Sequence, residues 1–176
     1  MPDGANKGAF IQAYNAQIAV DEHAQIIVAA TVVQASNDVR QLVPMAAKIV
    51  ENVGRLADTT SADTGYFSAQ NVEHPAFAQT NLLVPPPPQK AERMSVTEVS
   101  SAAAQMRAKL SSVANGALYK QRKAIVEPVF GQIKGARGLR QLLLRGLDAA
   151  CAEFNFIALT HNVLKLFRHG ARPALA

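Results

Sequence analysis

The stretch that decides the fold is residues 10–33, which read FIQAYNAQIAVDEHAQIIVAATVV. In its first part Ala16, Ile18 and Val20 share one face of a strand, opposite Asn15 and Gln17, which is typical of a strand with one buried face. Residues 21–23, Asp-Glu-His, are a polar break of hairpin size. The remainder is β-branched and almost continuously apolar, as in a strand that is covered on both faces. We therefore expect a hairpin of two antiparallel strands.

Downstream of the hairpin, apolar residues recur at helical spacing from Val39 to Val53, and Gly54 is expected to end this helix. The candidates for its N-cap are Ser36-Asn37-Asp38, because short polar side chains accept hydrogen bonds from the first free backbone N–H groups. Pro44 lies inside the pattern and is expected either to bend the helix or to delay its start.

The rest of the chain is expected to alternate short strands with helices. Four consecutive prolines at 85–88 favour polyproline II geometry, so residues 85–94 are predicted to be a stiff exposed linker. We place this linker inside a single domain that spans residues 1–176. The expected elements are strands at 56–63 and 81–84, a short helix from Ser68 to Val72, a polar solvent-facing helix from Ser95 to Ser112 that stops near Asn115-Gly116, and helices at 118–133 and 147–167.

The composition excludes several classes of protein. A single cysteine, Cys151, rules out a disulfide-stapled secreted scaffold and a cysteine-based zinc site. The longest apolar stretches fall far short of the ~20 residues that a bilayer core requires. The polar first eight residues lack the basic and then apolar pattern of a signal peptide. We expect a soluble cytoplasmic protein.

Positive charge is concentrated in the last third of the chain. The formal net charge is +5 overall, −2 for residues 1–117 and +7 for residues 118–176. Such a basic block suits a polyphosphate partner, because each Lys or Arg that neutralises a phosphate releases condensed counterions. A solvated basic surface without a specific partner explains the composition equally well.

Two carboxylates are candidates for chemistry. Asp63 follows an expected strand and precedes a turn at Gly65, which is where open α/β sheets place ligand-binding groups. The commoner role for an Asp in this setting is an Asx-turn or a helix cap. Glu127 shares a helix face with Lys123 and Lys134. That arrangement suits a metal-binding carboxylate beside cations that hold phosphates, or an ordinary surface ion pair.

The remaining polar candidates favour structural roles. Pro128 disfavours helical geometry at Glu127, so either the helix kinks there or Glu127 is an N-cap. Asp21 is interpreted as a turn former, and His161 as a core or capping group. The histidines show no metal-ligand spacing with Cys151; they are His23, His74, His161 and His169.

Four stretches carry a family resemblance, and together they span nearly the whole chain. They are YNAQIAVD at 14–21, DTGY at 63–66, YKQRK at 119–123 with VEPVFGQIK at 126–134, and HNVLKL at 161–166. In this order they resemble the C-terminal part of the catalytic domain of insertion-sequence DDE transposases. The third stretch is the most specific, because it resembles the Tyr, Arg, Glu, Lys signature of that family.

The resemblance implies an α/β fold, namely a ribonuclease-H-like mixed sheet flanked by helices with a C-terminal helical part. It also implies Mg²⁺ or Mn²⁺ held by three carboxylates, for cutting and joining DNA by in-line phosphoryl displacement. By position, Asp63 resembles the second catalytic metal ligand and Glu127 the third. Four residues separate Arg122 from Glu127, where the family signature has three between its Arg and Glu. The signature Arg therefore corresponds to Arg122 or to Lys123. Expected contacts to the DNA backbone are Tyr119, Lys120, Arg122, Lys123, Lys134, Arg137, Arg140 and Arg145.

The family's first strand, which ends in the first catalytic acid, has no counterpart in the sequence. The hairpin resembles the second and third strands of the family fold, and residues 56–63 resemble the fourth. A missing central strand leaves sheet edges unpaired, so we expect a truncated domain that is inactive alone. It would need the missing N-terminal part, from its own or another chain, or would form a homo-oligomer. The alternatives are a non-catalytic DNA-binding or dimerisation remnant of a transposase, and an α/β domain whose basic surface has no role.

Overall fold

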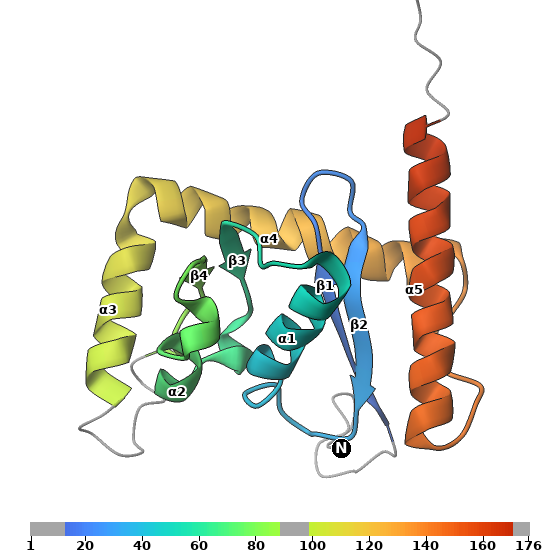
Figure 1. Ribbon diagram of the computed structural model, residues 1–176, viewed down its shortest axis with the longest axis horizontal. Coiled ribbons are helices and arrows are strands. Elements are labelled where there is room, and N and C mark those ends of the chain that lie inside the picture. Colours follow the sequence, from blue (N-terminus) through green and yellow to red (C-terminus); the bar gives the residue numbers. More distant parts are fainter. Residues whose placement is uncertain (1–12, 89–98, 171–176) are drawn as a thin grey trace, which may run out of the picture. The chain divides into compact units, whose positions relative to one another are not determined.

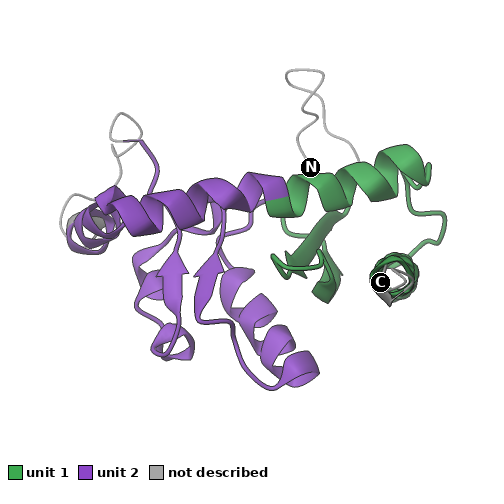
Figure 2. Ribbon diagram, turned by 90° about the horizontal axis from the view of Figure 1, so that it is seen from above, with its two compact units in different colours: residues 1–36, 125–176 green, residues 37–124 purple. Residues whose placement is uncertain are grey.

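The computed structural model describes residues 13–88 and 99–170, and the chain divides into two compact units. Unit 1 contains residues 1–36 and 125–176, and unit 2 contains residues 37–124 (Figure 2). Each unit has its own cluster of buried apolar side chains, so each is described separately.

Helices and short strands alternate along the chain (Figure 1). Three of the helical segments, η1, η2 and η4, are single 3₁₀ or π turns. The order is β1 (Asn15–Val20), β2 (Ile27–Val33), α1 (Leu42–Val53), β3 (Thr59–Ser61), η1 (Thr64–Tyr66), α2 (Ala69–Val72), η2 (Pro75–Phe77), β4 (Asn81–Leu83), α3 (Val99–Ser111), α4 (Val113–Gly131), η4 (Gln132–Ala136) and α5 (Leu147–Gly170).

The expected hairpin is confirmed in unit 1, although residues 10–12 of the prediction lie outside the described residues. β1 and β2 are antiparallel, with Asn15 opposite Val33 and an irregularity in the register next to Val20. The turn depends on Asp21, whose carboxylate accepts hydrogen bonds from the backbone N–H groups of His23 at 2.8 Å and Ile26 at 2.6 Å. Asp21 is therefore a turn former, as its sequence position predicts.

α5 covers one face of the hairpin and forms the core of unit 1 with it. In Figure 1 the helix runs alongside β2. Ala29 and Val32 point to opposite faces of β2 and are 2% and 3% exposed, which confirms a strand covered on both faces. The core cluster contains Ile27, Ala30, Val32, Val129, Ile133, Ala150, Phe154, Ile157 and Ala158.

α4 begins earlier than the sequence predicts. The expected stop at Asn115-Gly116 is wrong, because the chain breaks at Ser112 and resumes helical geometry at Val113. Pro128 lies inside α4, so the alternative of Glu127 as an N-cap is wrong as well. Glu127 lies in the interior of α4, which begins 14 residues earlier at Val113. Four residues after Pro128 it widens into the single π turn η4.

Unit 2 is built around the parallel pair β3 and β4, with Thr59 opposite Asn81. α1 begins at Leu42 after an N-cap at Gln41, so the expected N-cap within residues 36–38 is wrong. The carbonyl of Asp38 instead accepts from the Gln41 N–H and closes a turn before the helix. The delayed start that Pro44 predicts is confirmed, and Gly54 ends the helix with a φ of 84°.

The core of unit 2 is smaller and comes mainly from α1, η2 and β4. The sequence predicts that α3 faces solvent, but one side of this helix is buried. Pro85, Pro86 and Pro87 are half-buried, and Arg107 donates to the Pro87 carbonyl at 3.2 Å; residues 89–94 of the expected linker lie outside the described residues. The core cluster contains Leu42, Ala46, Phe77, Leu82 and Val84, and the buried residues of α3 include Ala102, Ala103 and Met106.

The fold is α/β, as the sequence predicts, with two small sheets. Within residues 13–88 and 99–170 each sheet has two strands, and no described strand joins them into the expected mixed sheet. No described helix is both long and apolar enough to cross a membrane.

Candidate functional site

Asp63 lies at the carboxyl end of the β3–β4 pair. The pairing ends with the Ala62 N–H donating to the Leu83 carbonyl at 3.0 Å, and Asp63 follows directly. Its Oδ1 accepts from the Thr64 N–H at 2.8 Å and caps the 3₁₀ turn η1. The structure thus combines both interpretations of this residue, since Asp63 is a helix cap at the strand end where α/β sheets bind ligands.

The second oxygen of Asp63 faces a cation from α4. Arg122 Nη2 lies 3.6 Å from Asp63 Oδ2, and the Arg122 guanidinium is 5.7 Å from the centre of the Tyr119 ring. The Arg122 side chain is only 16% exposed, and its buried Nε has no hydrogen-bond partner in the structure. Within unit 2, Arg122 therefore pairs with Asp63, and Tyr119 contacts Arg122 rather than Asp63. Lys123, the other candidate for the signature Arg, is exposed.

Glu127 belongs to unit 1 and is exposed on α4. The adjoining face is apolar as expected, because Val129 is fully buried and Ile133 is 3% exposed. Lys134 lies in the π turn η4, and its ammonium is 5.3 Å from the centre of the Phe130 ring. Asp63 and Glu127 are thus anchored in different units.

The side chains expected to contact DNA differ in their exposure and in their hydrogen bonds within the protein. Arg137 is engaged in unit 1, where it donates to the Ile157 carbonyl at 3.4 Å and to the Thr160 hydroxyl of α5. Arg140 is exposed but its Nε donates to the Lys134 carbonyl at 3.3 Å. The exposed cations are Lys120, Lys123, Lys134, Arg140 and Arg145, whereas Tyr119, Arg122 and Arg137 are half-buried.

A polar contact network that sequence reasoning missed joins α5 to the hairpin. His161 is 1% exposed, and its Nε2 lies 2.9 Å from the Gln25 carbonyl, as expected for a satisfied core histidine. Asn162 makes two bonds of 2.8 Å to the backbone of Ile27, and Lys165 donates to the Gln25 side chain at 2.7 Å. Gln25 has a φ of 58°, which is uncommon for a residue other than glycine. Local sequence patterns do not predict these hydrogen bonds, because the bonded residues are far apart in the sequence.

Burial lowers the pKa of two groups in this network. Desolvation lowers the pKa of His161 below its ordinary value, and the nearby charges of Lys165 and Arg137 lower it further, against the opposing effect of the Gln25 carbonyl bond. Desolvation also lowers the pKa of Lys165, assisted by Arg168 and opposed by Asp21. The neutral imidazole donates its Nε2 proton to the Gln25 carbonyl.

A shallow hollow of about 320 Å³ opens between the hairpin turn and the end of α5. Its walls carry both signs of charge, and the rings of His23 and His169 lie 5.9 Å apart at their centres. None of the predicted site residues lines it. The lining residues are Glu22, His23, Ala24, Gln25, Lys165, Arg168 and His169.

The carboxylates do not complete a metal site. Among residues 13–88 and 99–170 no group of three or more His, Cys, Asp or Glu side chains is placed to hold an ion. Carboxylate oxygens are the ligands that Mg²⁺ prefers, so Asp63 and Glu127 have suitable chemistry. The set is nevertheless short of the three carboxylates that the family resemblance implies.

Comparison with known families gives one match. Residues 86–167, just under half of the chain, match the family described as transposase DDE domain. The matched segment contains α3, α4 and most of α5, together with Glu127 and all the expected DNA contacts. No curated protein and no solved structure matches the chain. Residues 86–167 are therefore similar to part of a transposase DDE domain, which supports the expected resemblance to a transposase fragment.

Proposed function

We propose that this chain is a fragment of a transposase catalytic domain that binds the DNA backbone and is inactive in DNA cleavage by itself. The match of residues 86–167 to the transposase DDE domain carries the proposal. The order of elements supports it: an antiparallel pair, a helix and a parallel pair follow one another as they would in a ribonuclease-H-like fold without its first strand.

The sheet topology supports the idea that a strand is missing. A central strand pairs on both sides, so its removal divides one sheet into two. The described residues contain two such separate pairs, β1–β2 and β3–β4. The first catalytic acid of the family would end the missing strand, which accounts for the incomplete set of carboxylates.

In the completed domain Asp63 and Glu127 would be two of three oxygen ligands for Mg²⁺ or Mn²⁺, and the metal would supply an activated nucleophile for phosphoryl transfer. Arg122 would hold Asp63 in position through its ion pair. The exposed cations Lys120 and Lys123 precede Glu127 on α4 and would neutralise DNA phosphates without reading sequence.

The second candidate is a non-catalytic DNA-binding remnant. The contacts of Asp63 favour it, because one oxygen caps η1 and the other faces Arg122. Both contacts stabilise unit 2 without any metal. In this case the basic residues retain a role, and the two carboxylates have only structural ones.

Duplex binding at several salt concentrations, followed by fluorescence anisotropy, tests the DNA-binding part of the proposal. We expect affinity to fall steeply with salt and the Lys123→Ala variant to lower the log–log slope by about 1. Arg40→Ala removes another exposed cation from unit 2 and is the matched control, with no change in slope expected. Glu127→Ala should bind DNA as well as the unchanged chain does.

Cleavage and strand-transfer assays with Mg²⁺ or Mn²⁺ test the catalytic part. We expect no product from this chain alone, because the carboxylate set is incomplete. Robust strand transfer by the purified chain would contradict the proposed inactivity, and salt-independent affinity would contradict DNA-backbone binding.

A further inference from the structure

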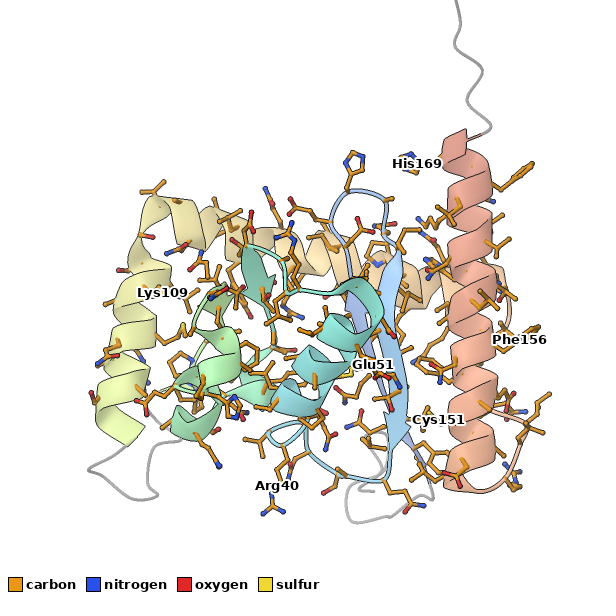
Figure 3. The ribbon with its side chains drawn as sticks, in the orientation of Figure 1. Arg40, Glu51, Lys109, Cys151, Phe156 and His169 are labelled. Carbon is orange, nitrogen blue, oxygen red and sulfur yellow. The ribbon has the colours of Figure 1, made fainter. Side chains whose placement is uncertain are left out.

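α5 has a second apolar face that nothing in the described structure covers. Its inner face packs on the hairpin through Phe154 and Ile157, whereas Phe156 projects from the opposite side of the helix (Figure 3). The exposed fractions on this outer face are large: 65% for Phe156, 56% for Leu159, 57% for Val163, 63% for Leu166 and 71% for Phe167. Contiguous exposed apolar surface of this kind marks an interaction site.

The apolar residues of the outer face are spaced as in a coiled coil. Ala152, Phe156, Leu159, Val163 and Leu166 follow one another at steps of four, three, four and three residues. These steps average 3.5 residues, which is the repeat that keeps one seam of a helix in contact with a partner helix. Leucines at the d positions with a β-branched Val163 at an a position favour two parallel strands.

The area of this seam is sufficient for a pair of identical helices. At roughly 100 Å² of exposed apolar surface for each of five large side chains, a symmetric pair would bury on the order of 1,000 Å². Specific protein interfaces begin at about this size. Leu143 and Leu144 are 71% and 50% exposed and lie beside the same helix, where both backbone N–H groups donate to Glu153.

Charge also permits self-association. From Leu147 to Leu164 the only charged residues of α5 are Asp148 and Glu153. Glu153 flanks the seam, and its carboxylate is already bonded to the backbone of Leu143 and Leu144. An interfacial membrane helix would carry Lys and Arg along its polar face, whereas the opposite face of α5 is occupied by the hairpin.

We propose that α5 pairs in parallel with α5 of a second copy of this chain, through Phe156, Leu159, Val163 and Leu166. The pairing joins equivalent residues across a two-fold axis, as isologous contacts require. It is independent of DNA and of metal, so its test does not depend on the proposed function.

Sedimentation equilibrium of the whole chain tests the pairing. We expect a reversible dimer, and we expect Leu159→Glu to weaken dimerisation by roughly 100-fold, because each copy loses a buried apolar side chain and gains a charge. The control is Val113→Glu, which makes the same kind of change at a 91% exposed residue outside the seam and should leave the dimer intact. Circular dichroism shows that each variant remains folded.

Disulfide trapping tests the parallel orientation. In a Cys151→Ser background, Leu166→Cys should form a covalent dimer under a mild thiol oxidant, because a parallel pair brings the two thiols together. Ser101→Cys, on the exposed side of α3, should not cross-link. A monomer at all concentrations, a Leu159→Glu variant that still dimerises, or failure of the Leu166 cross-link would overturn the proposal.

Discussion

Unit 1 and unit 2 each contain one pair of strands but stabilise it in different ways. In unit 1 the strands are six and seven residues long, and one helix of 24 residues covers them. In unit 2 the strands are three residues long, and side chains from surrounding segments bond to the backbone within and just before them. Thr80 donates to the Ala57 carbonyl at 2.7 Å and Lys109 to the Leu82 carbonyl at 3.0 Å. In unit 1 one long helix supplies the apolar cover, whereas in unit 2 side-chain hydrogen bonds to the backbone add to the apolar cluster that contains Leu82 and Val84.

The largest expected effects come from a matched pair of core substitutions. Phe154 in unit 1 and Phe77 in unit 2 are both 5% exposed. Phe154→Ala and Phe77→Ala should each lower the free energy of unfolding by about 3–5 kcal/mol, because each leaves a cavity in a packed cluster. Hydrogen exchange should show lost protection mainly in the unit that carries the change. Equal loss in both units after either substitution would show that the two clusters unfold together.

Substitution of buried polar groups should give the next largest loss of stability. The loss should depend on pH in unit 1 but not in unit 2. Asn71 in unit 2 donates to the carbonyls of Val39 and Tyr66, so Asn71→Ala should cost about 1–3 kcal/mol at any pH. His161 in unit 1 has a lowered pKa in the folded state. The unfolded chain therefore takes up this proton first, and the contribution of His161 is complete above about pH 6.5 and lost as pH falls through its folded pKa.

Denaturant unfolding at a series of pH values measures this difference. His161→Gln keeps a hydrogen-bond donor for the Gln25 carbonyl but cannot titrate, so its stability should vary less with pH between 7 and 5 than that of the unchanged chain. An identical pH profile for the two proteins would show that His161 does not carry the acid sensitivity.

The smallest expected effect concerns the segment before α5. Two backbone hydrogen bonds, from Leu143 and Leu144, lower the pKa of Glu153; desolvation opposes them with a smaller effect, and the charge of Arg145 lowers the pKa least. This contribution is present above the ordinary pKa of a Glu and is lost as pH falls through the lowered value. Glu153→Gln should speed amide exchange at Leu143 and Leu144 with little change in global stability. Unchanged exchange at both amides would show that the carboxylate does not hold the segment.

Sequence patterns predict the hairpin and the long helices because these depend on local periodicity. Leu147 begins α5 as expected, and Asn81 begins β4. The same patterns do not predict helix ends well. Asn115 and Gly116 favour a stop, yet the helix starts just before them, at Val113. Turn residues in the first turn of a helix are tolerated, since the first N–H groups have no helical partner in any case.

The candidate site was predictable only in part, for a similar reason. The position of Asp63 follows from strand and turn signals that lie within a few residues of it. Its partner Arg122 comes from a helix far along the chain, and no local signal connects the two. The contact between His161 and Gln25 is likewise set by tertiary packing, since the two residues are 136 positions apart in the sequence.

Cys151 gives the chain an internal reporter. Its thiol is half-buried on the inner side of α5, 3.8 Å from the Thr31 hydroxyl on β2 (Figure 3). Since it is the sole cysteine of the chain, the rate of its alkylation reports on one position only, where α5 contacts the hairpin. The unchanged chain therefore allows the packing of α5 on the hairpin to be followed by the alkylation of a single thiol.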